Sequence, residues 1–453
     1  MHIDGYKCPN CGGTVKFDSS AQQMKCPYCD AEFEIAALEE HQKEINASAK
    51  DEFAWNAQPE SSAWDGAETD DLAAGNCPSC GAELFGNENT VAAVCPCCGN
   101  AQIVIKRLCG TLKPDYVIPF KLEKKAAVDA MKEFCKKKRL LPKFFTQENH
   151  VESMQGIYVP FWLFDADANG HVRFKAAKTS TRGSGKNTYT EVKHYSVIRD
   201  GSLAFEKIPV DGSEKMDDAY MDAIEPFHYN EMKEFNKAFL AGYVAERYDV
   251  DAEKSKARAE ERIKSSLVKE FKDTVKGYTT VTVESSAINV KNGKVSYGLF
   301  PVWVLNTKYN NENYQFMMNG QTGRLVGKLP VDKGKSWGYM GGISAIFGAL
   351  LSLFAFMGGA EALDLQMPLA MAIAWCLSVV GGISVVQFWT YQMNTARQKT
   401  EAGQYIKPGS LSITRKDEKF LYKSGGRSGS GIAAAGTLGA AIGVASALSK
   451  MRK

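Results

Sequence analysis

Eight cysteines repeat one spacing pattern twice, and this pattern constrains the fold more than any other feature of the chain. The first copy is Cys8-x2-Cys11, fourteen further residues and Cys26-x2-Cys29, and each cysteine of the second copy lies 69 positions later. Paired CxxC turns at this separation are typical of tetrahedral coordination by four thiolates. We therefore predict two structural zinc ions (Zn2+), one bound by Cys8, Cys11, Cys26 and Cys29 and the other by Cys77, Cys80, Cys95 and Cys98.

The same sulfur atoms allow two other interpretations. Disulfides characterise small secreted domains, whereas residues 1–8 contain no signal-peptide pattern, so we expect thiolates in a reducing compartment, the cytosol. Iron in a rubredoxin-like site of four thiolates is the alternative metal. Ribbons of this size cannot hold a hydrophobic core, so metal binding would supply their folding energy, about 10–16 kcal/mol per site in comparable peptides.

The residues around the cysteines refine the ligand set. Glycine follows the second cysteine in three of the four turns, where a positive φ is commonly needed, and Asp30 takes this position in the other turn. Cys97 lies where the first repeat has Tyr28, so it is out of register with the ligands and we exclude it. Cys109, Cys135 and Cys376 lie in or beside apolar runs and are expected to be inert.

Two long uncharged stretches near the C-terminus predict a transmembrane hairpin. No charged residue occurs from Ser336 to Ala360 or from Leu365 to Ala396, and each stretch exceeds the roughly 20 apolar residues that cross a bilayer as a helix. Lysine and arginine flank both outer ends and the connecting turn is acidic, so both termini are expected in the cytoplasm. Small residues at i, i+4 spacing predict close packing within the hairpin, with dimerisation as the alternative.

The remaining chain mixes helical and strand periodicity, which indicates an α+β multidomain protein. Helical patterns occur at 122–139, 230–246 and 252–273, and strand patterns at 156–164, 187–199, 278–290, 294–306, 313–318 and 323–328. The predicted regions are zinc ribbon 1 (1–35), an acidic helix and linker (36–75), zinc ribbon 2 (76–109), an α+β cytoplasmic region (110–332), the hairpin (336–392, with spans at about 337–357 and 368–390) and a cytoplasmic Gly/Ser/Ala-rich tail (393–453).

Three segments allow two interpretations each. The linker residues Trp55 and Trp64 either fold back onto the body or dock a partner. The basic run at 136–139 is either a solvated helix end or a site of attraction to anionic lipid headgroups. The uncharged stretch at 428–449 is expected to be a flexible or interfacial tail, with a third span as the alternative.

The sequence offers no catalytic motif. The six histidines are scattered without HExxH, the glycine-lysine segments lack the spacing of a phosphate-binding loop, and no GxSxG occurs. Four thiolates leave a zinc ion no open position for water. The formal net charge of +3 is small, and metal-bound thiolates would offset it, so no basic field attracts nucleic acid. We therefore expect no enzyme activity and no catalytic residues.

Several longer strings resemble those of bacterial membrane proteins with TFIIB-type zinc ribbons. They are the CPxC pairs, LKPDYVIPFKLEKKAA (112–127), GIYVPFWLFDA (156–166), IPVDGSEKMDDAYMDAIEPF (208–227), LAGYVAERYDV (240–250) and NGQTGRLVGKLPVDKGK (319–335), followed by the hairpin. The resemblance implies docking of PspA-like and SPFH (flotillin-like) partners at the membrane during envelope stress. The resemblance assigns the role of metal ligand to the eight cysteines and to no other residue. Asp30, Cys97 and the low-complexity tail depart from the family pattern.

Together these features predict a zinc-ribbon scaffold or adaptor, anchored in the inner membrane, that recruits protein partners. The first rival is a membrane-tethered nucleic-acid-binding protein, which salt-dependent binding of DNA or RNA by residues 1–109 would support. The second rival is an enzyme of the α+β region, which a pocket with clustered carboxylates of shifted pKa would favour.

Overall fold

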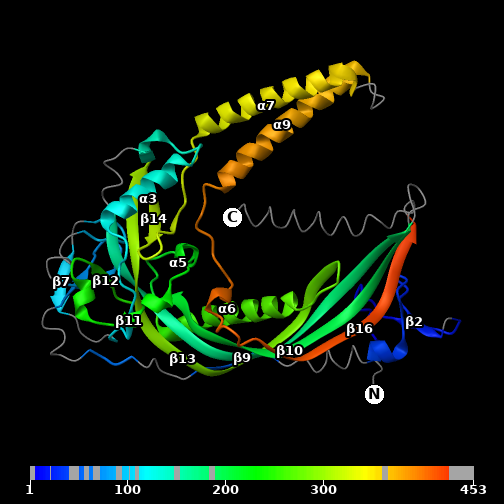
Figure 1. Ribbon diagram of the computed structural model, residues 1–453, viewed down its shortest axis with the longest axis horizontal. Helices are drawn as coiled ribbons and strands as arrows, with labels where there is room; N and C mark the ends of the chain where they lie inside the picture. The colour runs from blue at the N-terminus through cyan, green and yellow to red at the C-terminus, as the bar shows by residue number, and fades with distance from the viewer. Residues whose placement is uncertain are drawn as a thin grey trace.

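The computed structural model describes residues 6–20, 22–39, 50–55, 61–64, 72–87, 94–100, 103–107, 112–146, 154–182, 189–359 and 366–427. They form an α+β body on a 13-stranded sheet, with a separate three-stranded ribbon and two apolar helices that project from the body (Figure 1). The predicted fold class is confirmed: two four-cysteine groups, a mixed α+β body and an apolar helical pair are all present.

Four long strands build the centre of the molecule. They pair antiparallel in the order β16-β10-β9-β13, and their bounds are Ser412–Arg427, Tyr189–Asp211, Gln155–Arg182 and Thr280–Tyr309. Their outer halves form a curved arm that leads to ribbon 1 (Figure 1). Alternation sets the two faces: Ala166, Ala168 and Val172 are buried, whereas Asp167 and Asn169 are exposed.

Helix α6 (Ala252–Asp273) covers one face of these strands. Its buried positions recur at three- and four-residue spacing, as in Ala259, Ile263 and Leu267, and pack with Phe164 and Phe174 of β9. The opposite face holds a second core, in which Phe161 of β9 lies against Phe300 of β13. The body is therefore packed on both faces of its sheet.

Shorter strands complete the sheet at the end away from ribbon 1. β14 and β15 extend from β13, while β12 joins β9 to β6, β5 and β7. The bounds are β4 Glu52–Trp55, β5 Ala73–Asn76, β6 Glu83–Gly86, β7 Val104–Arg107, β8 Tyr116–Val117, β11 Lys233–Glu234, β12 Val244–Glu246, β14 Glu312–Asn319 and β15 Leu325–Gly327. Ribbon 2 thus shares the main sheet, whereas ribbon 1 has its own, with β1 Lys16–Asp18, β2 Gln23–Lys25 and β3 Glu32–Phe33.

The remaining helices are α3 (Lys124–Lys136), α5 (Asp218–Ile224), α7 (Lys333–Phe354) and α9 (Met367–Tyr391). Short 3-10 turns occur at Lys143–Thr146, Tyr229–Glu231, Lys237–Leu240 and Gly403–Tyr405, and a π turn at Ala355–Gly359. The helices predicted at 122–139 and 252–273 are confirmed. The helix predicted at 230–246 is wrong, because Val244 and Ala245 pair with β6 and β9 and the preceding segment forms short turns and β11.

Two parts of the chain outside the predicted core pack onto the body. Residues 412–427, placed by the sequence in a tail, form β16 instead, because their backbone pairs along β10; residues 428–453 lie outside the described residues. Trp55 and Trp64 fold back onto the body, the first of the two interpretations: Trp55 donates to Glu260 at 2.8 Å and contacts Phe164, and Trp64 lies against Phe85.

Helices α7 and α9 form an antiparallel pair that is long and apolar enough to span a membrane. Small residues bring them together: a Cβ atom on Gly382 would meet Ser344 Oγ at 2.2 Å, and one on Gly348 would meet the Trp375 ring at 3.0 Å. Packing within the hairpin accounts for these two glycines. Outward-facing side chains such as Leu350 and Phe388 are 59% and 57% exposed. The pair and the arm extend from the body toward the same side (Figure 1).

Candidate metal centres

The structure brings the eight predicted cysteine ligands together in two groups of four. Within each group all four Sγ atoms lie within 4.8 Å of one another. The Sγ–Sγ distances are 3.6 Å for Cys8–Cys29 and 3.5 Å for Cys11–Cys26, with 3.6 and 3.7 Å for the corresponding pairs of ribbon 2. A disulfide needs about 2.05 Å. Tetrahedral zinc with bonds of about 2.3 Å separates its sulfur atoms by about 3.8 Å, so the donor set fits this ion.

The four CxxC turns share one backbone geometry. In each, the amide of the residue after the second cysteine donates to the carbonyl of the first, as from Gly12 to Cys8 at 2.8 Å and from Asp30 to Cys26 at 2.9 Å. This residue has a positive φ in all four turns, 76°, 75° and 79° at the glycines and 55° at Asp30. Asp30 therefore adopts the conformation that glycine takes elsewhere, which aspartate tolerates better than most residues. The substitution leaves the turn intact.

Ribbon 1 is attached to the arm through a small contact. Phe33 packs edge-on against Tyr422 of β16 at 5.0 Å between ring centres, and Tyr422 stacks on His194 of β10 at 4.3 Å. Lys175 adds a hydrogen bond to the Pro9 carbonyl at 3.0 Å. Cys8 and Cys26 share a buried cluster with Leu421 and Tyr422, apart from the main core. Ribbon 1 is therefore held at the far end of the arm, away from the core of the body.

Ribbon 2 belongs to the core of the body. Cys77 and Cys95 lie in one buried cluster with residues of β9 and β13. Asn306 of β13 donates to the Pro96 carbonyl at 2.6 Å. Arg247, beside β12, forms an ion pair with Glu83 of β6. Loss of this ribbon would therefore disturb the core of the body, whereas loss of ribbon 1 would affect only the end of the arm.

Cys97 lies beside the ribbon 2 ligands without joining them. Its thiol is buried, and its sulfur lies 3.8 Å from Glu246 Oε1. A hydrogen bond from Cys97 lowers the pKa of Cys95 to about 5, and burial raises the pKa of Glu246 to about 8. Ser213 also donates to Glu246, at 2.8 Å. Cys97 thus lies between a ligand thiol and a buried carboxyl group, a placement that its position in the sequence did not indicate.

Both groups are closed sites. Each offers four sulfur atoms to one centre, which completes the tetrahedral coordination of zinc and leaves no position for water or substrate. Burial raises the pKa of the metal-free Cys8 thiol to about 12, so a metal must displace protons to bind there. The chemistry that this arrangement supports is structural: zinc would fix the turns and would not activate a nucleophile.

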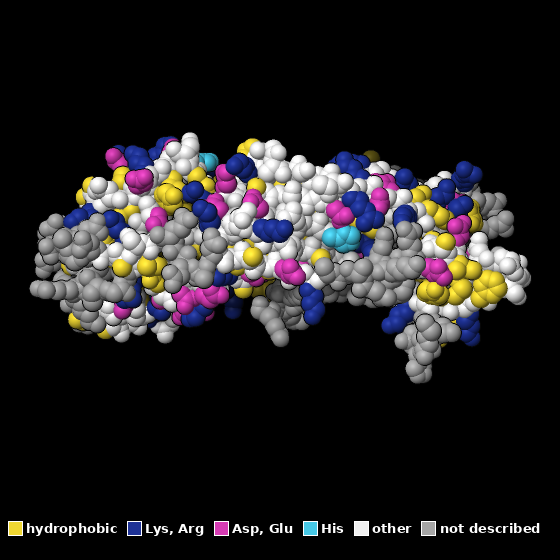
Figure 2. All heavy atoms as spheres, turned by 90° about the horizontal axis from the view of Figure 1, so that it is seen from below, with side chains coloured by type: hydrophobic (Ala, Val, Ile, Leu, Met, Phe, Trp, Pro, Cys, Tyr) yellow, Lys and Arg dark blue, Asp and Glu magenta, His cyan; other side chains and the backbone are white. Residues whose placement is uncertain are grey.

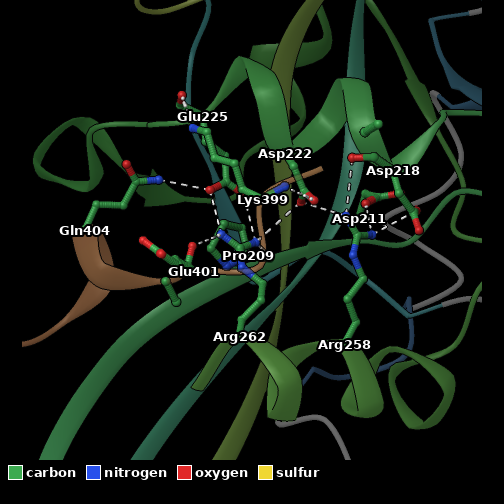
Figure 3. Close-up of polar contacts among 12 residues, drawn as sticks. Pro209, Asp211, Asp218, Asp222, Glu225, Arg258, Arg262, Lys399, Glu401 and Gln404 are labelled. Carbon is green, nitrogen blue, oxygen red and sulfur yellow. Dashed lines mark hydrogen bonds and ion pairs between the residues drawn. The ribbon is translucent and has the colours of Figure 1, made fainter. Parts of the chain in front are cut away.

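A second cluster of functional groups lies where α6 meets α5 (Figure 3). Arg258 contacts Asp211 and Asp222 at 2.6 Å each, and Arg262 makes a bidentate pair with Glu225 at 2.9 and 2.7 Å. Both partners of the Arg262–Glu225 pair are about 1% exposed. This cluster was not predicted from the sequence, although arginines at two core-facing positions of an amphipathic helix were a usable signal.

The segment after α9 is tied into the same cluster. The Lys399 amide donates to Asp222 at 3.0 Å, its ammonium donates to the Glu225 carbonyl at 3.1 Å, and Gln404 donates to the Glu225 carboxylate at 2.9 Å (Figure 3). The chain that leaves the helical pair is therefore fixed to the C-terminal end of α5 and, through Glu225, to Arg262 of α6.

A cavity of about 530 Å³ opens beside this cluster, with Asp211, Glu214, Asp217 and Asp218 among its lining residues. Burial raises the pKa of Asp211 to about 7 although Arg258 acts in the opposite direction. Carboxylates of shifted pKa in a pocket are what an enzyme would need. Here, however, Arg258 pairs with Asp211, Asp218 and Asp222, which accounts for the cluster as a link between α6, β10 and α5.

These features define a class of protein: an α+β body with two four-cysteine ribbons and an apolar helical pair able to span a membrane. The chain belongs to the same family as YdjG of Bacillus subtilis, to which it is 38% identical over 358 residues, or 79% of this chain and 99% of the relative. That relative is described as an uncharacterized protein. No family model matches the chain, and no solved structure matches it.

Proposed function

We propose that the protein is a scaffold, anchored in the inner membrane with both termini in the cytoplasm, that recruits protein partners. The main support is the surface of ribbon 1. Tyr28, Phe17 and Ile35 are 76%, 51% and 41% exposed, and hydrophobic side chains gather at this end of the molecule (Figure 2). Exposed aromatic side chains on a rigid support are typical of protein interfaces. Ribbon 1 is the proposed recruiting surface.

The closed metal sites favour a scaffold over an enzyme. Eight thiolates in two complete tetrahedral sets make rigid turns, and rigid turns present side chains at a fixed geometry. The helical pair would keep this surface close to the membrane, and the arm would hold it away from the body. The carboxylates near Asp211 serve the α6 ion pairs in this proposal, so no catalytic residue is assigned.

The partner class comes from the resemblance to TFIIB-type zinc-ribbon membrane proteins. It adds PspA-like and SPFH proteins as partners and envelope stress as the setting of the proposal. The alternative function, a membrane-tethered nucleic-acid-binding protein, would use the same exposed aromatic residues for base stacking. Salt dependence separates the two, because phosphate binding weakens steeply with salt and apolar docking does not.

The test uses the full-length protein in detergent with a purified PspA-like protein and a purified SPFH protein as probes. The variant Phe17→Ser with Tyr28→Ser changes only the exposed surface of ribbon 1, and Val283→Ser, at a site 45% exposed on β13, is the control. We expect the double variant to bind at least tenfold more weakly, the control to bind normally, and all three proteins to carry equal zinc. Unchanged binding by the double variant would remove ribbon 1 as the surface.

Two other outcomes would decide against the proposal. If neither probe binds the wild-type protein, recruitment of these partners is wrong. If single-stranded DNA or RNA binds instead, with affinity that falls steeply as salt rises and with loss in the double variant, the nucleic-acid alternative holds.

A further inference from the structure

The C-terminal end of α3 is fastened to the base of the helical pair. The Asp332 amide donates to the Leu140 carbonyl at 2.8 Å, and the Lys335 ammonium donates to the Leu141 carbonyl at 2.6 Å. Lys138 reaches the other helix and donates to the Gln392 carbonyl at 2.7 Å. The segment after α3 is therefore held where α7 begins and α9 ends.

This attachment places cations beside an aromatic pair. The Arg139 guanidinium lies 4.8 Å from the ring centre of Trp389, and Trp389 packs edge-on against Tyr339 at 5.3 Å. Arg397 lies 3.8 Å from the ring centre of Tyr391 at the end of α9. Tryptophan and tyrosine favour the headgroup level of a bilayer. The arginines are thus held at the level where lipid phosphates would lie.

The charge around the base is strongly positive. Two acidic side chains beside these cations are already engaged, since Glu133 pairs with Lys137 at 3.3 Å and Asp332 caps the first turn of α7. Lys136, Lys137 and Arg139 are all exposed. The cations of this surface, which we name the basic collar, are Lys136, Lys137, Lys138, Arg139, Lys143, Lys333, Lys335 and Arg397.

A groove between α7 and α9 continues from the same level. It has a volume of about 360 Å³ and changes in character along its length. Ser336, Gln387 and Thr390 line it near the helix ends, and Met340 and Ile383 line it further along. A polar part followed by an apolar part matches the glycerol region and the upper acyl chain of a phospholipid.

We propose that the basic collar and this groove form a binding site for an anionic phospholipid of the surrounding leaflet. The site would fix α3 against the bilayer and set the orientation of the body on the membrane. A solvated helix end would not require the three hydrogen bonds that fasten it to the helical pair. The inference rests on the membrane placement of the pair and is independent of the scaffold role.

The experiment titrates fluorescent phosphatidylglycerol into the delipidated full-length protein in a neutral detergent. The test variant combines Lys136→Gln, Lys137→Gln and Arg139→Gln, which spares the lysines that bond to the helical pair. A variant with the same change in charge, Lys291→Gln, Lys416→Gln and Lys423→Gln at exposed positions elsewhere, is the control. Each basic residue near an anionic surface contributes about fivefold in binding, so we expect about 100-fold weaker binding by the test variant only.

Further binding measurements identify the ligand. Phosphatidylcholine should bind the wild-type protein much more weakly than phosphatidylglycerol, and excess inorganic phosphate should not displace the lipid. Equal binding by the test variant and the wild type would overturn the proposal, as would an equal loss in the control variant. Displacement by phosphate alone would show a site for a soluble anion and would also overturn it. Zinc content and hydrogen exchange of α6 serve to confirm that both variants are folded.

Discussion

Loss of the zinc site in ribbon 2 should unfold a larger part of the protein than loss of the zinc site in ribbon 1. We compare Cys11→Ser in ribbon 1 with Cys80→Ser in ribbon 2, since each removes one of four ligands. A structural zinc ion supplies about 10–16 kcal/mol to folding, which is as large as the 5–15 kcal/mol by which a typical protein is stable. Whatever part of the fold depends on a site should therefore unfold with it.

The contacts of each ribbon determine how far the unfolding should spread. In ribbon 2, Cys77 and Cys95 share a core with Phe161 and Phe300, and β6 pairs with β12, so disorder should spread into the main sheet. Ribbon 1 meets the arm mainly at Tyr422, so disorder should stay within residues 6–39 and the end of β16.

Elemental analysis and hydrogen exchange measured by mass spectrometry test this reasoning. We expect two zinc ions per chain in the wild type and one in each variant, with lost protection at 6–39 for Cys11→Ser and at 72–107 and β12 for Cys80→Ser. Cys97→Ser, buried beside the site but outside the ligand set, is the control and should retain both ions. The same exchange pattern in both ribbon variants, or zinc loss in the control, would refute the reasoning.

Three further predictions concern the body and the helical pair. Arg262→Met should destabilise the protein by about 3–5 kcal/mol, because Glu225 would remain buried and unpaired; hydrogen exchange of α6 measures this, and a loss below about 1 kcal/mol would contradict it. Since the folded pKa of Asp211 is raised to about 7, its contribution to the unfolding free energy falls as pH rises from about 4 to 7. Between pH 5 and pH 7 the wild type should lose about 2 kcal/mol relative to Asp211→Asn, and parallel pH profiles would contradict this. The helical pair and the arm extend to the same side, so insertion of the pair in a nanodisc should bend the arm away at the bulges of β10 and β13. Spin labels, one on the pair and one on the arm, should then move apart. An unchanged distance between the labels would count against a membrane-spanning pair.

The local patterns of the sequence were sufficient for the metal groups and for several elements. Four cysteines separated by at most 21 residues, with turns that favour a positive φ, predict one cluster without knowledge of the rest of the fold. The helix at 252–273 and the two apolar helices follow from periodicity and from the lack of charge in the same way. Each of these depends on interactions between residues close in the chain.

Other features depend on contacts with distant parts of the chain, which no local sequence pattern identifies. Residues 412–427 were predicted to be part of a Gly/Ser/Ala-rich tail, but they form β16 and pair with β10, where His194 bonds Ser424, 230 residues away. Arg262 occupies a core-facing position of its helix, but its partner Glu225 and the segment after α9 are identified only by the tertiary structure. The cysteine spacing determined that there would be two metal groups, and only the tertiary structure placed one in the core and the other at the end of an arm. The physical reason is that thiolate coordination closes over a short loop, whereas strand pairing and burial are decided by which distant surfaces meet.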